Sequence, residues 1–152
     1  MRKLPLIIGL FVGSIPFAAL AQEAVVAQPD ALKWGAAPPY LTPGPQAVGI
    51  TGDPSKAMPY VVRLKLPAGY KVMPHNHPND ENVTVISGEF HLGIGDKFDE
   101  SKGQVIKPGG YAQTPTGVNH FAWTGAETII QLHGVGPGGL TYVNPSDDPR
   151  KK

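Results

Sequence analysis

Glycine and proline recur along the whole chain, and this feature limits its possible folds more than any other. Of the 152 residues, 19 are glycine and 17 are proline. Both favour turns over helix interiors. Short apolar runs lie between them, and 41% of residues are hydrophobic, unlike a disordered low-complexity segment. The sequence therefore predicts one all-β domain with many tight turns, since this length leaves little room for two.

From about Val48 onward, alternating apolar and polar segments are separated by turn residues. In Tyr60–Leu66, for example, Val62, Leu64 and Leu66 share one face, as expected for a half-buried strand. The pattern predicts strands at 60–66, 70–77, 81–86, 89–95, 103–106, 111–113, 119–124 and 127–135. No window shows helical periodicity, so a sandwich or a barrel is expected.

The first 21 residues differ in kind from the rest. Arg2 and Lys3 precede the uncharged stretch 4–21, which ends in the small-residue site Ala19-Leu20-Ala21. This layout is typical of a secretory signal peptide, so we predict export to the periplasm or the medium, with cleavage near Ala21. An uncleaved membrane anchor and a buried helix are the alternatives. Two prolines within the stretch favour cleavage, and no stable membrane insertion is expected afterwards.

The expected organisation is a signal peptide over 1–21, an extended proline-rich arm over 22–46, a β domain over 47–145 and a polar tail over 146–152. Cleavage would remove two of the 13 basic residues and none of the 12 acidic ones. No basic surface is left, so nucleic acid is not expected as a partner. The chain has no cysteine, which excludes disulfides and thiolate zinc sites.

The most informative segment contains His75, His77 and Glu81. Side chains two positions apart on a strand point to the same side, so the two imidazoles can converge on one ion. Residues 78–80 allow the chain to turn and return on the neighbouring strand with the Glu81 carboxylate facing the same point. Downstream, the turn 115–117 redirects the chain so that His120 begins a strand facing inward.

Three imidazoles and one carboxylate leave coordination positions open, as catalytic metal sites do. A single histidine on a strand is more often an ordinary surface or core residue, so the prediction rests on the combination. We predict one divalent metal ion held by His75, His77, Glu81 and His120. Fe, Mn, Zn, Cu and Ni all suit this ligand set, and ligand type alone does not choose among them.

These segments resemble the two motifs of the cupin superfamily, G-x5-H-x-H-x3-E-x6-G and G-x5-P-x-G-x2-H-x3-N. The first matches at every defined position from Gly69 to Gly88. The second matches from Gly109 through His120, but Thr124 stands where the motif has Asn. The resemblance covers about 48–142 and implies a conical, jelly-roll (double-stranded β-helix) barrel of about six to eight strands around the metal. One copy of each motif implies a single-domain cupin, a kind that commonly forms homodimers.

The resemblance also implies a range of functions. Cupin enzymes cleave rings or diketones with O2, decarboxylate, isomerise or eliminate, so the first hypothesis is a dioxygenase-like enzyme acting on a small chelating or anionic molecule. A binding or sensing module for a small molecule is the alternative, and a purely structural metal is a third hypothesis.

Strand parity indicates further residues around the predicted metal site. Gln131 and His133 share a face of the last strand and are catalytic candidates if that face is interior. Trp123 is expected to pack outside the barrel, against the arm or a second subunit. An apolar pocket is predicted from strand parity, lined by Met73, Val83, Val85 and Ala122.

Overall fold

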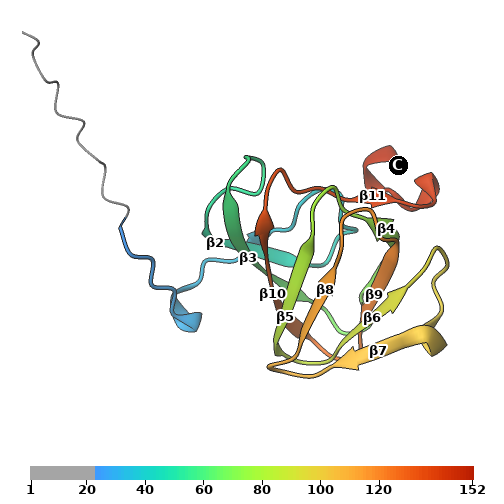
Figure 1. The fold of residues 1–152 in the computed structure, drawn as a ribbon. Coiled ribbons are helices and arrows are strands. Elements are labelled where there is room, and N and C mark those ends of the chain that lie inside the picture. Colours follow the sequence, from blue (N-terminus) through green and yellow to red (C-terminus); the bar gives the residue numbers. More distant parts are fainter. Residues whose placement is uncertain (1–22) are drawn as a thin grey trace, which may run out of the picture.

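The computed structural model describes residues 23–152, which form two antiparallel sheets that face each other (Figure 1). The predicted signal peptide over 1–21 lies outside the described residues. The first sheet has the order β1-β2-β3-β10-β5-β8: Gly35–Ala36, Gln46–Thr51, Pro59–Leu66, Thr128–Val135, Glu81–Ser87 and Tyr111–Thr114. The second has the order β11-β4-β9-β6-β7: Thr141–Tyr142, Lys71–Asn76, His120–Thr124, Phe90–Ile94 and Gly103–Ile106. The prediction of an all-β, jelly-roll-like fold is confirmed.

Each predicted strand is present, with ends that differ by a few residues. The strand β2 and the short strands β1 and β11 were not predicted. In β1 and β11, two residues are too few to show a periodicity. The other regular elements of the described residues are short 3-10 turns: η1 (Pro29–Ala31), η2 (Glu100–Lys102), η3 (Pro145–Asp147) and η4 (Pro149–Lys151). Within this part of the chain, none of the helices has the length and apolar character needed to span a membrane.

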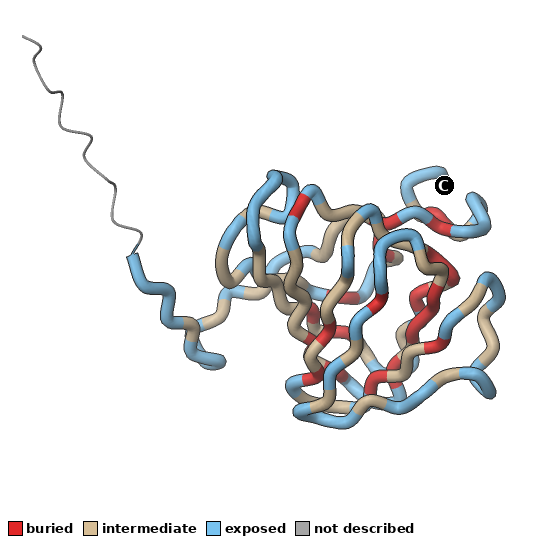
Figure 2. Tube along the Cα trace, in the orientation of Figure 1, coloured by how far each residue is buried: buried red, intermediate tan, exposed pale blue. Residues whose placement is uncertain are grey.

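The core lies between the two sheets. Val83 and Val85 on β5 and Leu66 on β3 are almost fully buried, and they face Phe90 and Ala122 of the second sheet. Figure 2 shows these buried stretches along the strands, while turns and the N-terminal segment are exposed. Burial of these side chains is the main favourable contribution to folding in a chain without disulfides.

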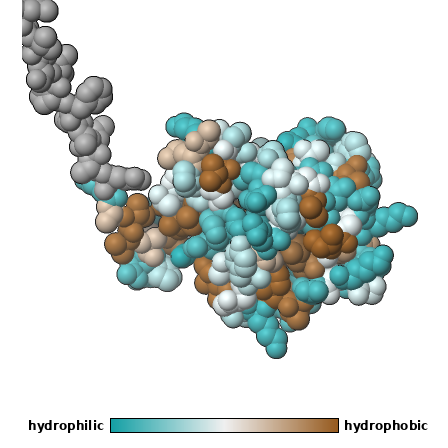
Figure 3. Space-filling view, in the orientation of Figure 1, coloured by the Kyte–Doolittle hydropathy of each residue, from teal (hydrophilic) through white to brown (hydrophobic). Residues whose placement is uncertain are grey.

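The predicted N-terminal arm has two parts with different environments. Residues 23–33 project away from the sheets (Figure 1), and Figure 3 shows apolar side chains on this segment. Val25 and Val26 in it are exposed. The second part folds back onto the domain, where β1 pairs with β2 and Leu41 is buried. The Tyr142 hydroxyl fixes it by donating to the Tyr40 carbonyl at 2.9 Å.

An aromatic cluster lies on the outer face of the second sheet. Phe121 is fully buried there beneath Phe98, and Trp123 stacks on His91 with ring centroids 4.6 Å apart. Trp123 therefore packs outside the core, as predicted, but its neighbours are His91 and the connection between β6 and β7, not the arm.

The glycines at the defined positions of both motifs have positive φ angles. They are Gly69, Gly88, Gly109 and Gly117. At Gly88 the requirement is also steric, because a Cβ there would come within 2.3 Å of the Glu127 carbonyl oxygen. Only glycine combines the left-handed conformation with this approach. The turn between β5 and β6 therefore depends on the glycine that closes the first motif.

Thr124, which replaces the motif's Asn, has a structural role. Its hydroxyl donates to the Pro67 carbonyl at 2.6 Å and accepts from the Tyr70 N–H at 3.0 Å. The residue is 2% exposed, so water cannot replace these partners. The hydroxyl thus ties the turn before β4 to the end of β9.

Replacing this hydroxyl by a methyl group tests its role. Thr124→Val keeps the volume but leaves a buried carbonyl and N–H with fewer partners, so we expect the free energy of unfolding to fall by about 1–3 kcal/mol. Urea unfolding measures it. Thr124→Ser, which keeps the hydroxyl, serves as the control, and equal stability of Thr124→Val and wild type would contradict the assignment.

The C-terminal segment is polar, but it is not simply a solvated tail. Arg150 pairs with the buried Asp148 through two hydrogen bonds of 2.7 and 2.8 Å. It also donates to the Leu140 carbonyl at 3.2 Å. These contacts hold the two last 3-10 turns against the segment that leads into β11.

Candidate metal centre

Three histidines from the two predicted motifs come together between the sheets. His75 on β4 and His120 on β9 are direct cross-strand partners, and His77 follows β4 by one residue. One nitrogen from each of the three lies within 4.8 Å of the others. Two nitrogens on opposite sides of one ion would be roughly 4.2 Å apart, so the cluster is close to the size of a coordination shell.

Glu81 reaches the cluster by a route that differs from the prediction. The expected return on the neighbouring strand is wrong, because β4 pairs with β9 and β11, whereas β5 belongs to the opposite sheet. Residues 78–80 therefore cross between the sheets. The Glu81 oxygens lie 3.3 Å from His77 Nε2 and 3.4 Å from His120 Nε2. The cluster thus joins the two layers of the fold.

Each imidazole is oriented by a backbone carbonyl at its Nδ1 atom. His75 Nδ1 lies 2.7 Å from the Met73 oxygen and His120 Nδ1 lies 3.0 Å from the Val118 oxygen. His77 Nδ1 has the Gly139 oxygen as its partner. A neutral imidazole that donates from Nδ1 has its lone pair on Nε2, and a carbonyl in this position is typical of histidines that bind metals.

The inward-facing atoms of this cluster are acceptors without donors. Nε2 of His77 and of His120 is buried and has no hydrogen-bond partner among the described residues. The nearest polar atoms are the Glu81 oxygens, which as a carboxylate also only accept. Buried acceptors that face one another need a proton or a cation between them. The four residues therefore fit a divalent metal ion.

Burial and mutual contact shift the pKa values in this cluster. Burial, followed by the neighbouring His120 and His77, lowers the pKa of His75 to about 3, so His75 stays neutral and able to ligate. Burial alone would lower the pKa of His77, but the Glu81 carboxylate outweighs it and raises that pKa. Burial would raise the pKa of Glu81, yet its contacts with His120 and His77 lower it well below its usual range.

The cluster forms one wall of a cavity of about 460 Å³ between the sheets. This volume falls in the range of small-molecule sites. Aliphatic side chains from both sheets make up most of the remaining wall: Leu64, Leu66, Val72, Val83, Leu92, Ile130 and Leu132. Four residues of the arm, Ala36, Pro38, Tyr40 and Leu41, also line it. The prediction that the pocket is largely apolar is confirmed.

Two of the four predicted pocket residues are correctly placed. Val83 and Ala122 line the cavity, whereas Val85 is buried without reaching it. Met73 does not line it because the pairing of β4 with β9 is irregular between Val72 and His75. This irregularity changes the alternation of faces, so Val72 takes the place expected for Met73.

The catalytic candidates Gln131 and His133 are not part of this site. Ile130 and Leu132 of β10 face the cavity, so the residues between and after them face outward. Gln131 accepts a hydrogen bond from Arg63 Nε at 3.1 Å on the outer face. His133 lies in a separate surface groove beside Asn82 and Gln113. The condition for their role, an interior face, is not met.

Several residues of the site were not predicted. Tyr40 and Tyr60 line the cavity, and Gly139 supplies the carbonyl that orients His77. Burial, with smaller contributions from Tyr60 and Glu81, raises the pKa of Tyr40, so its phenol remains protonated. Tyr40 lies in an arm without periodicity and Gly139 in a turn, so no local pattern marks either as part of a site.

Solved structures with similar folds are consistent with this architecture. The polyketide cyclase RemF from Streptomyces resistomycificus superimposes with a TM-score of 0.68 at 16% identity, over 85% of this chain and 92% of that one. A putative acetylacetone dioxygenase from Methylibium petroleiphilum gives 0.63 at 18% identity, over 84% and 86%. An RmlC-like cupin from Shewanella frigidimarina gives 0.57 at 15% identity, over 76% and 95%. The chain therefore has the fold of the cupin superfamily.

No protein-family model matches the sequence, and no curated protein matches it either.

Proposed function

We propose that this protein binds one divalent metal ion through His75, His77, Glu81 and His120 and is a metal-dependent enzyme of the dioxygenase type. Its substrate would be a small chelating molecule. One observation carries the proposal: three imidazoles, each oriented by a backbone carbonyl, turn Nε2 toward one point beside Glu81. Nothing among the described residues satisfies Nε2 of His77 and His120.

The chain's own residues would bind, orient and shield the substrate. A bound ion would act as a Lewis acid, and iron or copper would add O2 activation. Tyr40 and Tyr60 supply phenol hydroxyls to the cavity wall, and the raised pKa of Tyr40 keeps it a proton donor. The aliphatic wall makes the surroundings of the site less polar than water, which strengthens polar interactions inside it.

One of the similar structures supports this class of reaction. It is a putative acetylacetone dioxygenase, and acetylacetone is a diketone that chelates through two oxygens. The polyketide cyclase shares the fold but is named for a different reaction. We propose O2-dependent cleavage of a diketone or a catechol as the reaction to test first, ahead of decarboxylase, lyase or isomerase chemistry. Export, cleavage near Ala21 and a homodimer stay predictions from the sequence.

The test is metal-dependent O2 consumption. The protein is loaded separately with Fe(II), Mn(II), Cu(II), Ni(II) or Zn(II) and assayed in an oxygen electrode with a panel of diketones and catechols. We expect turnover with at least one redox-active metal, and none in the His75→Ala/His77→Ala double variant. His91→Ala, on the outer face of the second sheet, is the matched control. Metal binding without turnover of any panel member would refute the proposal that the protein is a dioxygenase-type enzyme.

A binding or sensing module is the second candidate, and one observation favours it. Besides the four proposed ligands, Tyr40 and Tyr60 are the titratable residues that line the cavity among those described. A site with so few acid–base groups can hold a small molecule without transforming it. Tight, metal-dependent binding of a panel member that remains chemically unchanged would support this candidate.

Metal affinity should depend on pH. Lowering the pH protonates imidazole, and a protonated imidazole cannot bind a metal. His77, whose pKa is raised, should protonate before His75, whose pKa is about 3, so the loss of affinity between pH 8 and pH 5 should come from protonation of His77. Equilibrium dialysis between pH 8 and pH 5, followed by elemental analysis, measures this. Unchanged metal content over that interval would contradict a ligand set with three histidines.

A further inference from the structure

We infer that the cavity accepts a ligand with one metal-binding oxygen group and an otherwise uncharged, apolar body, and that it rejects analogues that carry an additional carboxylate. This inference rests on the proposed function, since the metal is the point of attachment. It narrows the substrate class from any chelating or anionic molecule to a singly charged chelator. Leu132 on β10 is a position where this selectivity can be changed.

The cavity wall offers no cation that would stabilise a second negative charge. Among the described residues, no lysine or arginine lines it. Its ionisable groups are the three histidines and Glu81 at one wall, with Tyr40 and Tyr60. The rest of the wall consists largely of aliphatic side chains. A carboxylate buried against such a surface loses hydration without gaining a charged partner, which is unfavourable.

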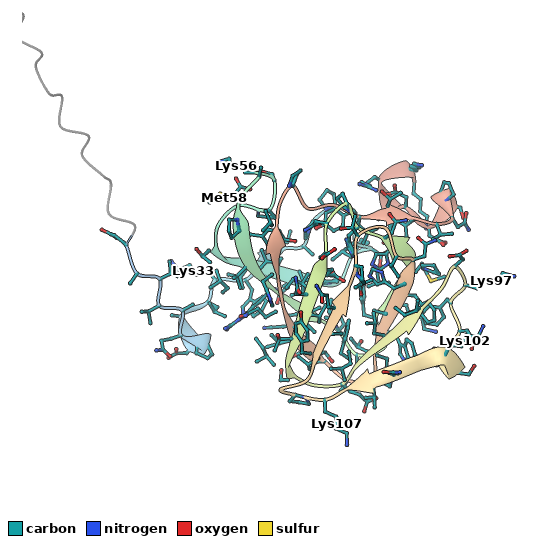
Figure 4. The ribbon with its side chains drawn as sticks, in the orientation of Figure 1. Lys33, Lys56, Met58, Lys97, Lys102 and Lys107 are labelled. Carbon is teal, nitrogen blue, oxygen red and sulfur yellow. The ribbon has the colours of Figure 1, made fainter. Side chains whose placement is uncertain are left out.

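The cations of the described chain lie elsewhere. Figure 4 shows Lys33, Lys56, Lys97, Lys102 and Lys107 at the periphery of the molecule. Lys65 lies over the Trp34 ring, and Lys71 pairs with Glu100 at 2.9 Å. None of these side chains lines the cavity.

The two arginines of residues 23–152 have hydrogen-bond partners outside the cavity. Arg63 donates to Gln131 on the outer face of the first sheet. Arg150 pairs with Asp148, and its guanidinium lies 6.0 Å from the centre of the Tyr40 ring. Tyr40 lines the cavity and Arg150 does not, so this charge lies outside the wall and has its own counterion.

The charge balance of the metal site also favours a ligand with a single negative charge. A divalent ion bound by Glu81 and three neutral imidazoles keeps one net positive charge. One enolate or one singly ionised catechol neutralises it, and any further anionic group would have to be buried without compensation. A cavity of about 460 Å³ leaves room for a substantial apolar body behind the chelating oxygens.

A pair of probes that differ in one charge tests the inference. Methyl 3,4-dihydroxybenzoate and 3,4-dihydroxybenzoate share the catechol and nearly the same size, but only the acid carries a carboxylate. The protein is loaded with Zn(II), its metal content is measured, and binding of each probe is followed by calorimetry without oxygen. We expect the ester to bind at least about tenfold more tightly than the acid.

A variant with a cation in the cavity should change this preference. Leu132→Arg places a guanidinium on the cavity side of β10, so the acid should gain affinity and the ratio should fall toward one or invert. His133→Arg adds the same charge on the outer side of the same strand and should keep the wild-type ratio. If Leu132→Arg fails to fold, the wild-type pair alone decides.

The outcomes separate this inference from the proposed function. Absence of bound zinc, or binding of both probes without any dependence on zinc, would refute the proposed metal site itself. With zinc bound, equal affinities, tighter binding of the acid, or binding of neither probe would overturn the inference about the substrate class.

Discussion

His120→Ala should reduce the bound metal from about one ion per chain to less than about a tenth. His120 is 1% exposed, and its Nε2 atom has no other partner. Its loss removes one of three nitrogen ligands and leaves the buried Glu81 with one imidazole neighbour fewer. The variant keeps three of the four proposed ligands, and a solvent molecule must replace the lost imidazole, so the affinity for the metal falls.

Elemental analysis after dialysis against a weak chelator measures the effect. Circular dichroism should show a retained fold, because the backbone pairing of β9 with β4 and β6 does not need the imidazole. Glu81→Gln should weaken binding less, since an amide oxygen still ligates. His91→Ala, on the outer face, should bind metal normally. Full metal content in His120→Ala would show that the metal, if any, is bound elsewhere.

Local patterns in the sequence predicted the strands and the residues that converge. The alternation in 60–66 and the turn signals around it gave the position of β3 within about one residue. The spacing of His75 and His77 predicted their convergence for the same reason. Alternation on a strand and a short turn are local properties, so they can be derived from neighbouring residues.

Properties that depend on distant partners were predicted less well. The irregularity between Val72 and His75 depends on how β4 pairs with β9, about 45 positions away in the chain. Placing Glu81 on a neighbouring strand failed because the assignment of strands to sheets is not local. Tyr40 lines the cavity and Gly139 orients His77, and both lie in segments that reach the site only through contacts formed in the folded chain.

The sequence did contain a signal for Gln131 and His133. Ile130 and Leu132 alternate with them on β10 and are both apolar, whereas Gln131 and His133 are polar. On a sheet with one face toward the core, the apolar set points inward. This rule gives the observed orientation, with Ile130 and Leu132 toward the cavity. The catalytic role expected for His133 rested on its residue type alone, and no pattern in the strand supported it.

Phe121→Ala should lower the free energy of unfolding by about 3–5 kcal/mol, the range for loss of a buried aromatic ring. Phe121 is fully buried on the outer face of β9, with its ring 5.1 Å from that of Phe98. Gly93 on β6 makes room for this ring, since a Cβ there would lie 2.3 Å from it. The surrounding backbone is held by the sheet, so the cavity left by the ring cannot collapse fully.

Urea unfolding of the metal-free protein measures this effect without a contribution from ligand binding. Ile94→Ala, at a residue of β6 that is 56% exposed, is the control and should change stability by no more than about 0.5 kcal/mol. Phe121→Leu should lose less than Phe121→Ala because it refills part of the volume. A loss below about 1 kcal/mol in Phe121→Ala would mean that the outer cluster contributes little to the stability of β9. In that case the position of His120 would depend on the inner core and the metal alone.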